Sequence, residues 1–177
     1  HDVVGTYAAW GLTKGSSAVK VFVLDSGVLA SHEDLATVVN IAPSGGASSS
    51  ITGDSTMNPH GTHVAGIIAA TANNGKGGAG IAPNVTIQAC RADGTGSAAG
   101  SFTSASVCTA LGRAISNGAY VVNMSIGGLW YNSAEDTAVQ SVLNNGIPIF
   151  AAEGNDGMQT YDYPAHYSGV ISVASTD

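Results

Sequence analysis

The fold is decided by the stretch VKVFVLDSG at residues 19–27, where a nearly continuous apolar run ends on Asp25. An apolar run of this length predicts a strand covered on both faces, as in a parallel sheet. A carboxylate at the end of a buried strand is costly to leave alone, so Asp25 needs a hydrogen-bond donor or a cation as its partner. Taken by itself, such an aspartate more often caps the turn that follows, here Ser26-Gly27.

A suitable partner lies in the stretch NPHGTHVAG at residues 58–66, where a helix is predicted to begin. His60 follows Pro59, and Gly61 allows another segment to approach closely. An imidazole fixed by a carboxylate at one nitrogen can act as a general base at the other. Asp25 and His60 are therefore candidates for two members of a nucleophilic triad, whereas no serine in a suitable setting is visible in the 177 residues.

The rest of the chain alternates strands with helices. Helices are predicted over residues 61–73, 103–117 and 134–145, and further strands over 85–90, 120–124, 147–152 and 170–174. This alternation predicts a mostly parallel, twisted α/β sheet with helices on both faces, in a single domain over residues 1–177. Ligands of such sheets bind beyond the carboxyl ends of the strands, where Asp25, Ser125 and Asn155 fall. The Ser/Gly-rich segment 43–56 is predicted to be a surface loop.

Composition narrows the classes of function. The chain is 44% hydrophobic and 10% charged with 24 glycines, which is typical of a compact globular domain. A net charge of -7 with five basic residues disfavours nucleic acid and anionic membranes as partners. The apolar runs are strand-sized, so no membrane span is expected, and no signal peptide is visible at the start. Cys90 and Cys108 permit one disulfide, and two buried free thiols are an equal alternative.

Seven short motifs along nearly the whole chain resemble the subtilisin-like serine proteases, the subtilases. They are VLDSG (23–27), SHEDL (31–35), HGTHVAG (60–66), GIAP (80–83), NMSIGG (123–128), GNDG (154–157) and YPA (163–165). The resemblance implies a subtilisin-like fold and serine endopeptidase activity, with Asp25 orienting His60, the general base and later the acid. Asn155 would donate its side-chain amide to the oxyanion of the intermediate. His63, one helical turn after His60, is expected to be a packing residue.

The resemblance also implies where a peptide substrate binds. A substrate would add as an extra strand along Ser125, Ile126 and Gly127. The facing wall of the pocket for the residue before the cleaved bond would be Ala152, Glu153 and Gly154. Glu153 stands where the family usually has a small apolar residue, so it either favours basic or polar substrate side chains or points to solvent. Residues 93–96 and 100–101 are both candidates for the opposite edge.

The family's serine lies in a Gly-Thr-Ser-Met-Ala-type segment that follows the region where this chain stops. The chain thus resembles the N-terminal portion of the catalytic domain, lacks the nucleophile segment, and is expected to be inactive alone. Ser55, Ser97 and Ser125 have other sequence contexts. We favour a nicked protease whose serine is on a companion chain, because removing the C-terminal part would expose apolar surface. A fragment of a longer protease and a naturally truncated homologue are also compatible with the sequence.

Two other functions are compatible with the same residues. One is a pseudoenzyme that binds peptides along residues 125–127 without cleaving them. The other is a metal-dependent hydrolase that uses Asp25 with His60 and His63. A chelator distinguishes the metal-dependent hydrolase from a triad enzyme. When calcium is removed, a triad enzyme would lose stability but keep its catalytic chemistry.

The loop ANNGKGG at residues 72–78 resembles a calcium-binding loop of many subtilases. By this resemblance a structural Ca²⁺ would be held by Asp34, Ala72, Asn74, Lys76 and Gly78, whose carboxylate, amide and carbonyl oxygens suit a hard cation. An ordinary Asn-Gly turn is the alternative. The resemblance further implies a secreted protein, with a propeptide or a protein inhibitor as additional partners.

Overall fold

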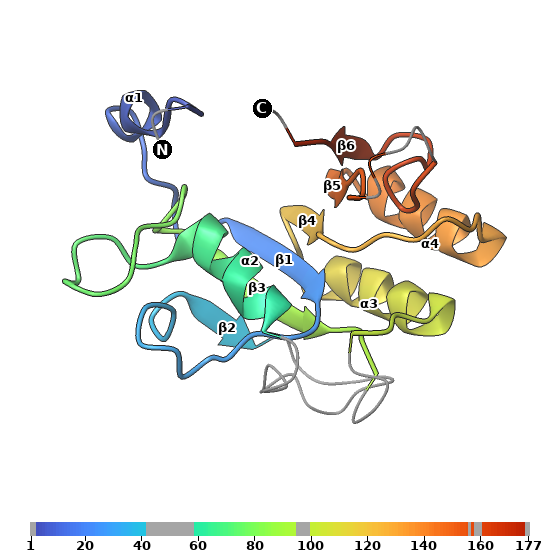
Figure 1. The fold of residues 1–177 in the computed structure, drawn as a ribbon, viewed down its shortest axis with the longest axis horizontal. Helices are drawn as coiled ribbons and strands as arrows, with labels where there is room; N and C mark the ends of the chain where they lie inside the picture. The colour runs from blue at the N-terminus through green and yellow to red at the C-terminus, as the bar shows by residue number, and fades with distance from the viewer. Residues whose placement is uncertain (1–2, 42–58, 95–99, 156, 158–160, 176–177) are drawn as a thin grey trace.

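The computed structural model describes residues 3–41, 59–94, 100–155, 157 and 161–175, which form a six-stranded parallel sheet with helices on both faces (Figure 1). The strands are β1 (Lys20–Asp25), β2 (Val39–Ile41), β3 (Thr86–Arg91), β4 (Val121–Met124), β5 (Ile149–Ala152) and β6 (Ile171–Val173). The helices are α1 (Thr6–Trp10), α2 (His60–Ala69), α3 (Ser104–Ser116) and α4 (Ser133–Asn144). The strand order is β2-β3-β1-β4-β5-β6, and every neighbouring pair is parallel. The predicted α/β architecture is confirmed, while the predicted loop 43–56 lies outside the described residues.

Strand β1 lies in the interior of the sheet because both of its faces are apolar. Phe22 and Leu24 belong to the core that α3 and α4 cover, whereas Val21 and Val23 belong to the core beneath α2. Alternate side chains of one strand therefore reach two separate hydrophobic cores. This double burial fixes the position of Asp25, the last residue of β1.

Helix α3 begins and ends where the sequence predicts. Thr103 caps its first turn, because its hydroxyl accepts from the Ser106 N–H while the Ser106 hydroxyl accepts from the Thr103 N–H. Gly118 follows the helix with φ of 63°, in the left-handed region that favours glycine. Both ends fall within one residue of the predicted range 103–117.

Helix α2 ends at Ala69, short of the predicted end at residue 73. The carbonyls that would continue the helix accept bonds from a returning segment, since Ile81 N donates to Ile67 O and Ala82 N to Ile68 O. Gly80 also packs so closely on Ala69 that a side chain there would overlap its backbone. A long-range contact, rather than local propensity, therefore ends this helix.

Two elements of the structure have no counterpart among the predicted ones. Helix α1 is held at the surface by Trp10, whose Nε1 donates to the carbonyl of Ile81 at 2.8 Å. Strand β2 pairs with β3. It has only three residues, which is too short for an alternating strand pattern to be identified from the sequence. Within the described part of the chain, no helix combines the length and apolar character needed to cross a bilayer.

Candidate active site

Asp25 and His60 meet at the carboxyl end of β1. His60 Nδ1 lies 2.9 Å from Asp25 Oδ1 and 3.0 Å from Oδ2. Because an ionised carboxylate only accepts, this contact assigns the Nδ1 proton to the imidazole. The Asp25 side chain is 1% exposed and that of His60 is 49% exposed. The pair thus combines a buried carboxylate with an imidazole that reaches solvent, which suits proton exchange at Nε2.

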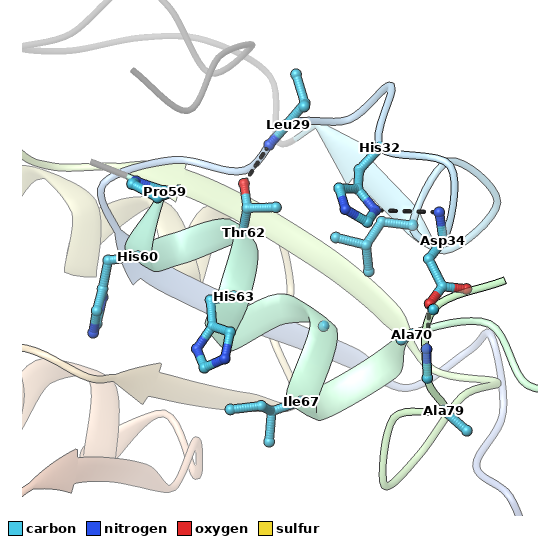
Figure 2. Close-up of a pocket in the computed structure, with 14 residues that line it drawn as sticks. Leu29, His32, Asp34, Pro59, His60, Thr62, His63, Ile67, Ala70 and Ala79 are labelled. Atoms are coloured by element: carbon cyan, nitrogen blue, oxygen red, sulfur yellow. Dashed lines mark hydrogen bonds between the residues drawn. The ribbon is translucent and has the colours of Figure 1, made fainter. Parts of the chain in front are cut away.

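The turn after β1 fixes this geometry. The backbone N–H of Ser26 donates to Asp25 Oδ1 at 2.7 Å, and the buried Ser26 hydroxyl accepts from the Gly61 N–H at 3.0 Å. Leu29 N donates to the Thr62 hydroxyl at 2.8 Å, one of the bonds drawn in Figure 2. The first turn of α2 is therefore bound to the segment after β1 through the two residues that follow His60.

Gly61 is required by the closeness of these two segments. A methyl group added at Gly61 would overlap the carbonyl oxygen of Gly27 and lie 3.1 Å from the β-carbon of Asp25. The contact is with backbone, which cannot rotate away as a flexible side chain would. The glycine after His60 thus allows the helix to approach the end of β1 closely enough for the two side chains to pair.

The expected peptide-binding segments leave the sheet side by side. Met124 pairs with Ala151 in the parallel β4–β5 ladder, so Ser125–Gly127 and Ala152–Gly154 continue from neighbouring strands. Asn123 Nδ2 donates to the Ser125 hydroxyl at 3.0 Å, which occupies that oxygen. The two segments therefore leave the sheet at the same edge as Asp25.

Glu153 is engaged with a neighbour and does not simply point to solvent. Its Oε1 lies 3.5 Å from Nδ1 of His166, and both side chains are about one-third exposed, at 33% and 30%. The ring of His166 in turn packs edge-on against Tyr161, with ring centroids 4.6 Å apart. Glu153 is therefore partly exposed to solvent and also paired with a histidine from the segment that follows β5.

Asn155 follows Gly154 beyond the end of β5 and is exposed. Gly154 has φ of 98°, so the chain reverses direction sharply just before the asparagine. Strand β5 is parallel to β4, which is parallel to β1, so Asn155 leaves the sheet at the same edge as Asp25. This position is compatible with the role expected from the family.

The two candidates for the opposite edge are arms of one loop after β3. Gly94 N donates to the carbonyl of Ser101 at 3.0 Å, and Asp93 forms an antiparallel bridge with Phe102. The buried Asp93 side chain accepts from Arg91 Nε at 2.6 Å and from Gly100 N at 2.8 Å. The two segments therefore support one another, while residues 95–99, and with them Ser97, lie outside the described part, as does Ser55.

His63 lies on the outer face of α2 and away from the carboxylate. Figure 2 shows His60, His63 and Ile67 projecting from the same side of the helix. They line a hollow of about 950 Å³ together with Leu29 and Leu35. Among the residues that the structure describes, no three His, Cys, Asp or Glu side chains are grouped to hold a metal ion. The metal-hydrolase alternative thus gains no support from the geometry.

Three of the predicted calcium ligands come together around Asp34, which is 4% exposed. Its Oδ1 accepts from Asn74 Nδ2 at 2.6 Å, and its Oδ2 accepts from the Gly78 N–H at 3.1 Å. Gly77 has φ of 45° and packs so tightly that a side chain there would overlap the carboxylate. Both contacts to the Asp34 carboxylate come from N–H donors, and the Asn74 amide oxygen accepts from the Lys76 N–H at 3.0 Å, so the Asp34 and Asn74 side chains are hydrogen-bonded within the loop in this structure. Ala72 and Lys76 belong to the same loop, but the Lys76 ammonium turns outward to Glu33 at 3.4 Å.

The two cysteines are free thiols in this structure. Burial raises the pKa of the Cys90 thiol, although the neighbouring Arg113 guanidinium opposes this effect. Burial also raises the pKa of Cys108, and the Glu135 carboxylate raises it further. Cys90 is buried and Cys108 is partly buried, so the structure has free thiols of which only Cys90 is fully buried.

One buried carboxylate near the site was not singled out in the sequence. Asp162 is 4% exposed, and its carboxylate lies between Gly127 and Gly154, which belong to the two expected peptide-binding segments. The only signal in the sequence is that an acidic residue directly precedes the motif YPA at residues 163–165. An acidic residue before a turn is ordinarily solvated, so its burial had to come from the structure.

Comparison with known proteins identifies the family of this chain. Residues 16–177 match the model of the subtilase family. The chain is 42% identical over 173 residues to thermitase of Thermoactinomyces vulgaris, covering 96% of this chain and 58% of thermitase. It is 39% identical over 171 residues to subtilisin DY of Bacillus licheniformis, covering 93% of this chain and 58% of that protein.

A solved structure shows the same fold. The psychrophilic subtilisin-like protease Apa1 from the Antarctic psychrotroph Pseudoalteromonas sp. AS-11 superposes with a TM-score of 0.84 at 34% identity. The match covers 99% of this chain and 40% of Apa1. The chain thus spans little more than half the length of the relatives named here, or less. Its sequence, its sheet and its paired aspartate and histidine together show that it belongs to the subtilase family of serine proteases.

Proposed function

We propose that the protein to which this chain belongs is a serine endopeptidase that hydrolyses peptide bonds through an Asp-His-Ser triad. The observation that carries the proposal is the contact of His60 Nδ1 with the buried Asp25 carboxylate at 2.9 and 3.0 Å. Asp25 holds the imidazole in the tautomer whose Nε2 can accept a proton, and it stabilises the imidazolium that forms. His60 then returns the proton to the leaving amine.

We place the peptide in a substrate slot that is proposed to lie between the segments that follow β4 and β5. An extended substrate pairs with Ser125–Gly127, where small residues leave room for another backbone. The side chain that precedes the cleaved bond enters between this segment and Ala152–Gly154. The Asn155 side-chain N–H donates a hydrogen bond to the developing oxyanion. This bond stabilises the transition state and contributes little to substrate binding.

The nucleophilic serine is supplied by a companion chain or segment. Thermitase and subtilisin DY both extend well beyond the part that this chain matches. Ile67 of α2 is 57% exposed, and Ile171 and Val173 of β6 are 44% and 50% exposed. An apolar helix face and an apolar edge strand favour a covering partner. We also propose secretion, with a propeptide or a protein inhibitor able to bind along the same slot.

Intact mass spectrometry under denaturing conditions tests this assignment. The purified native protein is treated with a serine-directed phosphonate before denaturation. The expected result is a phosphonate adduct on a component, or on a part of a longer chain, that lies outside residues 1–177. A single 17.5 kDa species that takes up no phosphonate would instead support the peptide-binding pseudoenzyme.

Replacing Asn155 with alanine in the complete protease tests the oxyanion role. The expected result is a fall in kcat of about 10²-fold, a magnitude known for the corresponding asparagine of subtilisin. KM should change by less than about threefold, because the bond is made mainly in the transition state. Steady-state hydrolysis of a peptide amide measures both constants. A rise in KM at constant kcat would contradict the role.

Calcium binding at the Asp34 loop is a further proposal, tested by thermal unfolding. Adding CaCl₂ at about 100 times its dissociation constant should stabilise the fold by about 2.7 kcal/mol. Asp34→Asn should abolish this gain, because it removes the carboxylate charge while keeping the shape of the side chain. Glu33→Gln is the matched control, since Glu33 is exposed and pairs with the Lys76 ammonium at the surface. Equal calcium gains in wild type and Asp34→Asn would exclude this site.

A further inference from the structure

A buried ion pair anchors the loop after β3, whose described residues form an outgoing arm (93–94) and a returning arm (100–102). Arg91 Nε donates to Asp93 Oδ1 at 2.6 Å, and the two side chains are 7% and 0% exposed. Either charge alone would be costly to bury in this position, so each group requires the other. Salt screens a buried pair far less than an exposed one, so this contact is a fixed feature of the loop.

The pair holds both arms of the loop. On the outgoing arm, Arg91 Nη2 donates to the carbonyl of Gly94 at 2.7 Å. On the returning arm, the Gly100 N–H donates to Asp93 Oδ2 at 2.8 Å. One oxygen of the carboxylate therefore binds the guanidinium, while the other binds the backbone at the start of the returning arm.

The ion pair is attached to the strand that carries Asp25. Arg91 is the partner of Asp25 in the parallel β1–β3 ladder, and Ala92 N donates to the carbonyl of Asp25 at 2.9 Å. Both strands are packed in the interior of the sheet, so this junction cannot shift without disturbing the core. The returning arm is thus held at a fixed place relative to the Asp25–His60 pair.

The returning arm borders the segment along which the peptide is proposed to bind. Phe102 of this arm and Ile126 of the segment 125–127 line the same hollow of about 160 Å³. Among the described residues around this hollow, the outgoing arm contributes none. The returning arm is therefore the better placed of the two to be the second edge for an extended peptide. Such an edge adds backbone hydrogen bonds at least entropic cost when it is already held in place.

We infer that Asp93 is a positioning residue, which holds the returning arm in place for peptides that extend several residues before the cleaved bond. The inference rests on the proposed function and concerns which substrates that site favours. A long peptide reaches the returning arm and gains interactions there, whereas a single amino-acid ester ends at the catalytic pair. Asp93 acts through the Gly100 N–H and needs no contact with the reacting atoms.

The test compares two substrates of the complete protease that share one leaving group: an acetylated single amino acid and the same residue extended by three others before it. Asp93→Asn leaves one acceptor oxygen, which cannot serve both Arg91 and Gly100. The ratio of kcat/KM between the long and the short substrate should fall by about tenfold. The kcat/KM for the short substrate should change by less than about threefold, because a merely structural loss lowers both substrates equally and leaves the ratio unchanged.

Two further variants accompany this comparison. Asp136→Asn removes an equal charge from α4, where the carboxylate accepts from the Tyr131 hydroxyl, and should leave the ratio unchanged. Arg91→Met combined with Asp93→Leu replaces the ion pair by apolar side chains, which leaves no unpaired charge in the interior should Asp93→Asn fail to fold. This double variant also lacks the acceptor for Gly100, so the same fall in the ratio is expected.

An unchanged ratio in Asp93→Asn, or in the double variant where Asp93→Asn does not fold, would overturn the inference. If the wild type hydrolyses neither substrate, the proposed protease function is rejected, and calorimetric binding of the long peptide decides the role of Asp93. Binding that is about tenfold weaker in the Asp93 variant would retain the positioning role. Equal affinity of wild type and variant would reject it.

Discussion

Replacing His60 with alanine in the complete protease is expected to lower kcat by about 10⁶-fold, the scale known for the triad histidine of subtilisin. Asp25→Asn should lower kcat by about 10⁴-fold, because the amide N–H can donate to Nδ1 and favour the tautomer that carries its proton on Nε2, and because the amide has no charge to stabilise the imidazolium. The double variant should be no worse than His60→Ala alone, since the two groups act as a unit. Active-site titration and peptide hydrolysis measure these losses.

His63→Ala is the matched control for the histidine variant. His63 projects from the same face of α2 one turn later (Figure 2). The Asp25 carboxylate pairs with His60. Its replacement should change kcat by less than about tenfold, because it removes packing and no proton transfer. Two results together would favour metal chemistry instead. The first is a loss of kcat in His63→Ala as large as in His60→Ala that added zinc reverses. The second is a wild-type activity that a chelator abolishes.

The central part of this fold could be predicted because its causes are local in the sequence. The apolar run of residues 19–24 is sufficient to indicate a strand buried on both faces. Thr103 caps the start of α3 and Gly118 terminates it, so both limits of the helix follow from these two residues. The Asp25–His60 contact was expected from two motifs, each of which binds the other through the turn residues Ser26 and Gly61.

The features that could not be predicted depend on contacts between distant segments. Helix α2 stops early because residues 80–82 return to its last carbonyls, and no local signal marks that return. The burial of Asp162 arises from the bridge between Gly128 and Tyr163, residues 35 positions apart in the sequence. Glu153 was recognised as unusual, but its partner His166 follows a turn whose course the sequence does not specify.

Gly61→Ala should be strongly destabilising and should also disrupt the catalytic pair. The added carbon would overlap the Gly27 carbonyl oxygen, so α2 must move away from the end of β1. Overpacking against backbone is expected to lower the free energy of unfolding by about 3 kcal/mol. Since His60 is the preceding residue, the same movement separates its Nδ1 from Asp25. The loss in kcat should therefore approach the ~10⁴-fold effect of Asp25→Asn.

Gly112→Ala separates this steric effect from a general effect of alanine in helices. Gly112 lies within α3, and an added β-carbon there meets no atom within 4 Å. Its replacement should raise the free energy of unfolding by about 0.5 to 1 kcal/mol through helix propensity alone, with no change in kcat. Urea denaturation measures the free energy of unfolding of both variants, which should fall for Gly61→Ala and rise for Gly112→Ala. If Gly61→Ala were as stable and active as Gly112→Ala, the close approach of α2 to β1 would not be what holds His60 against Asp25.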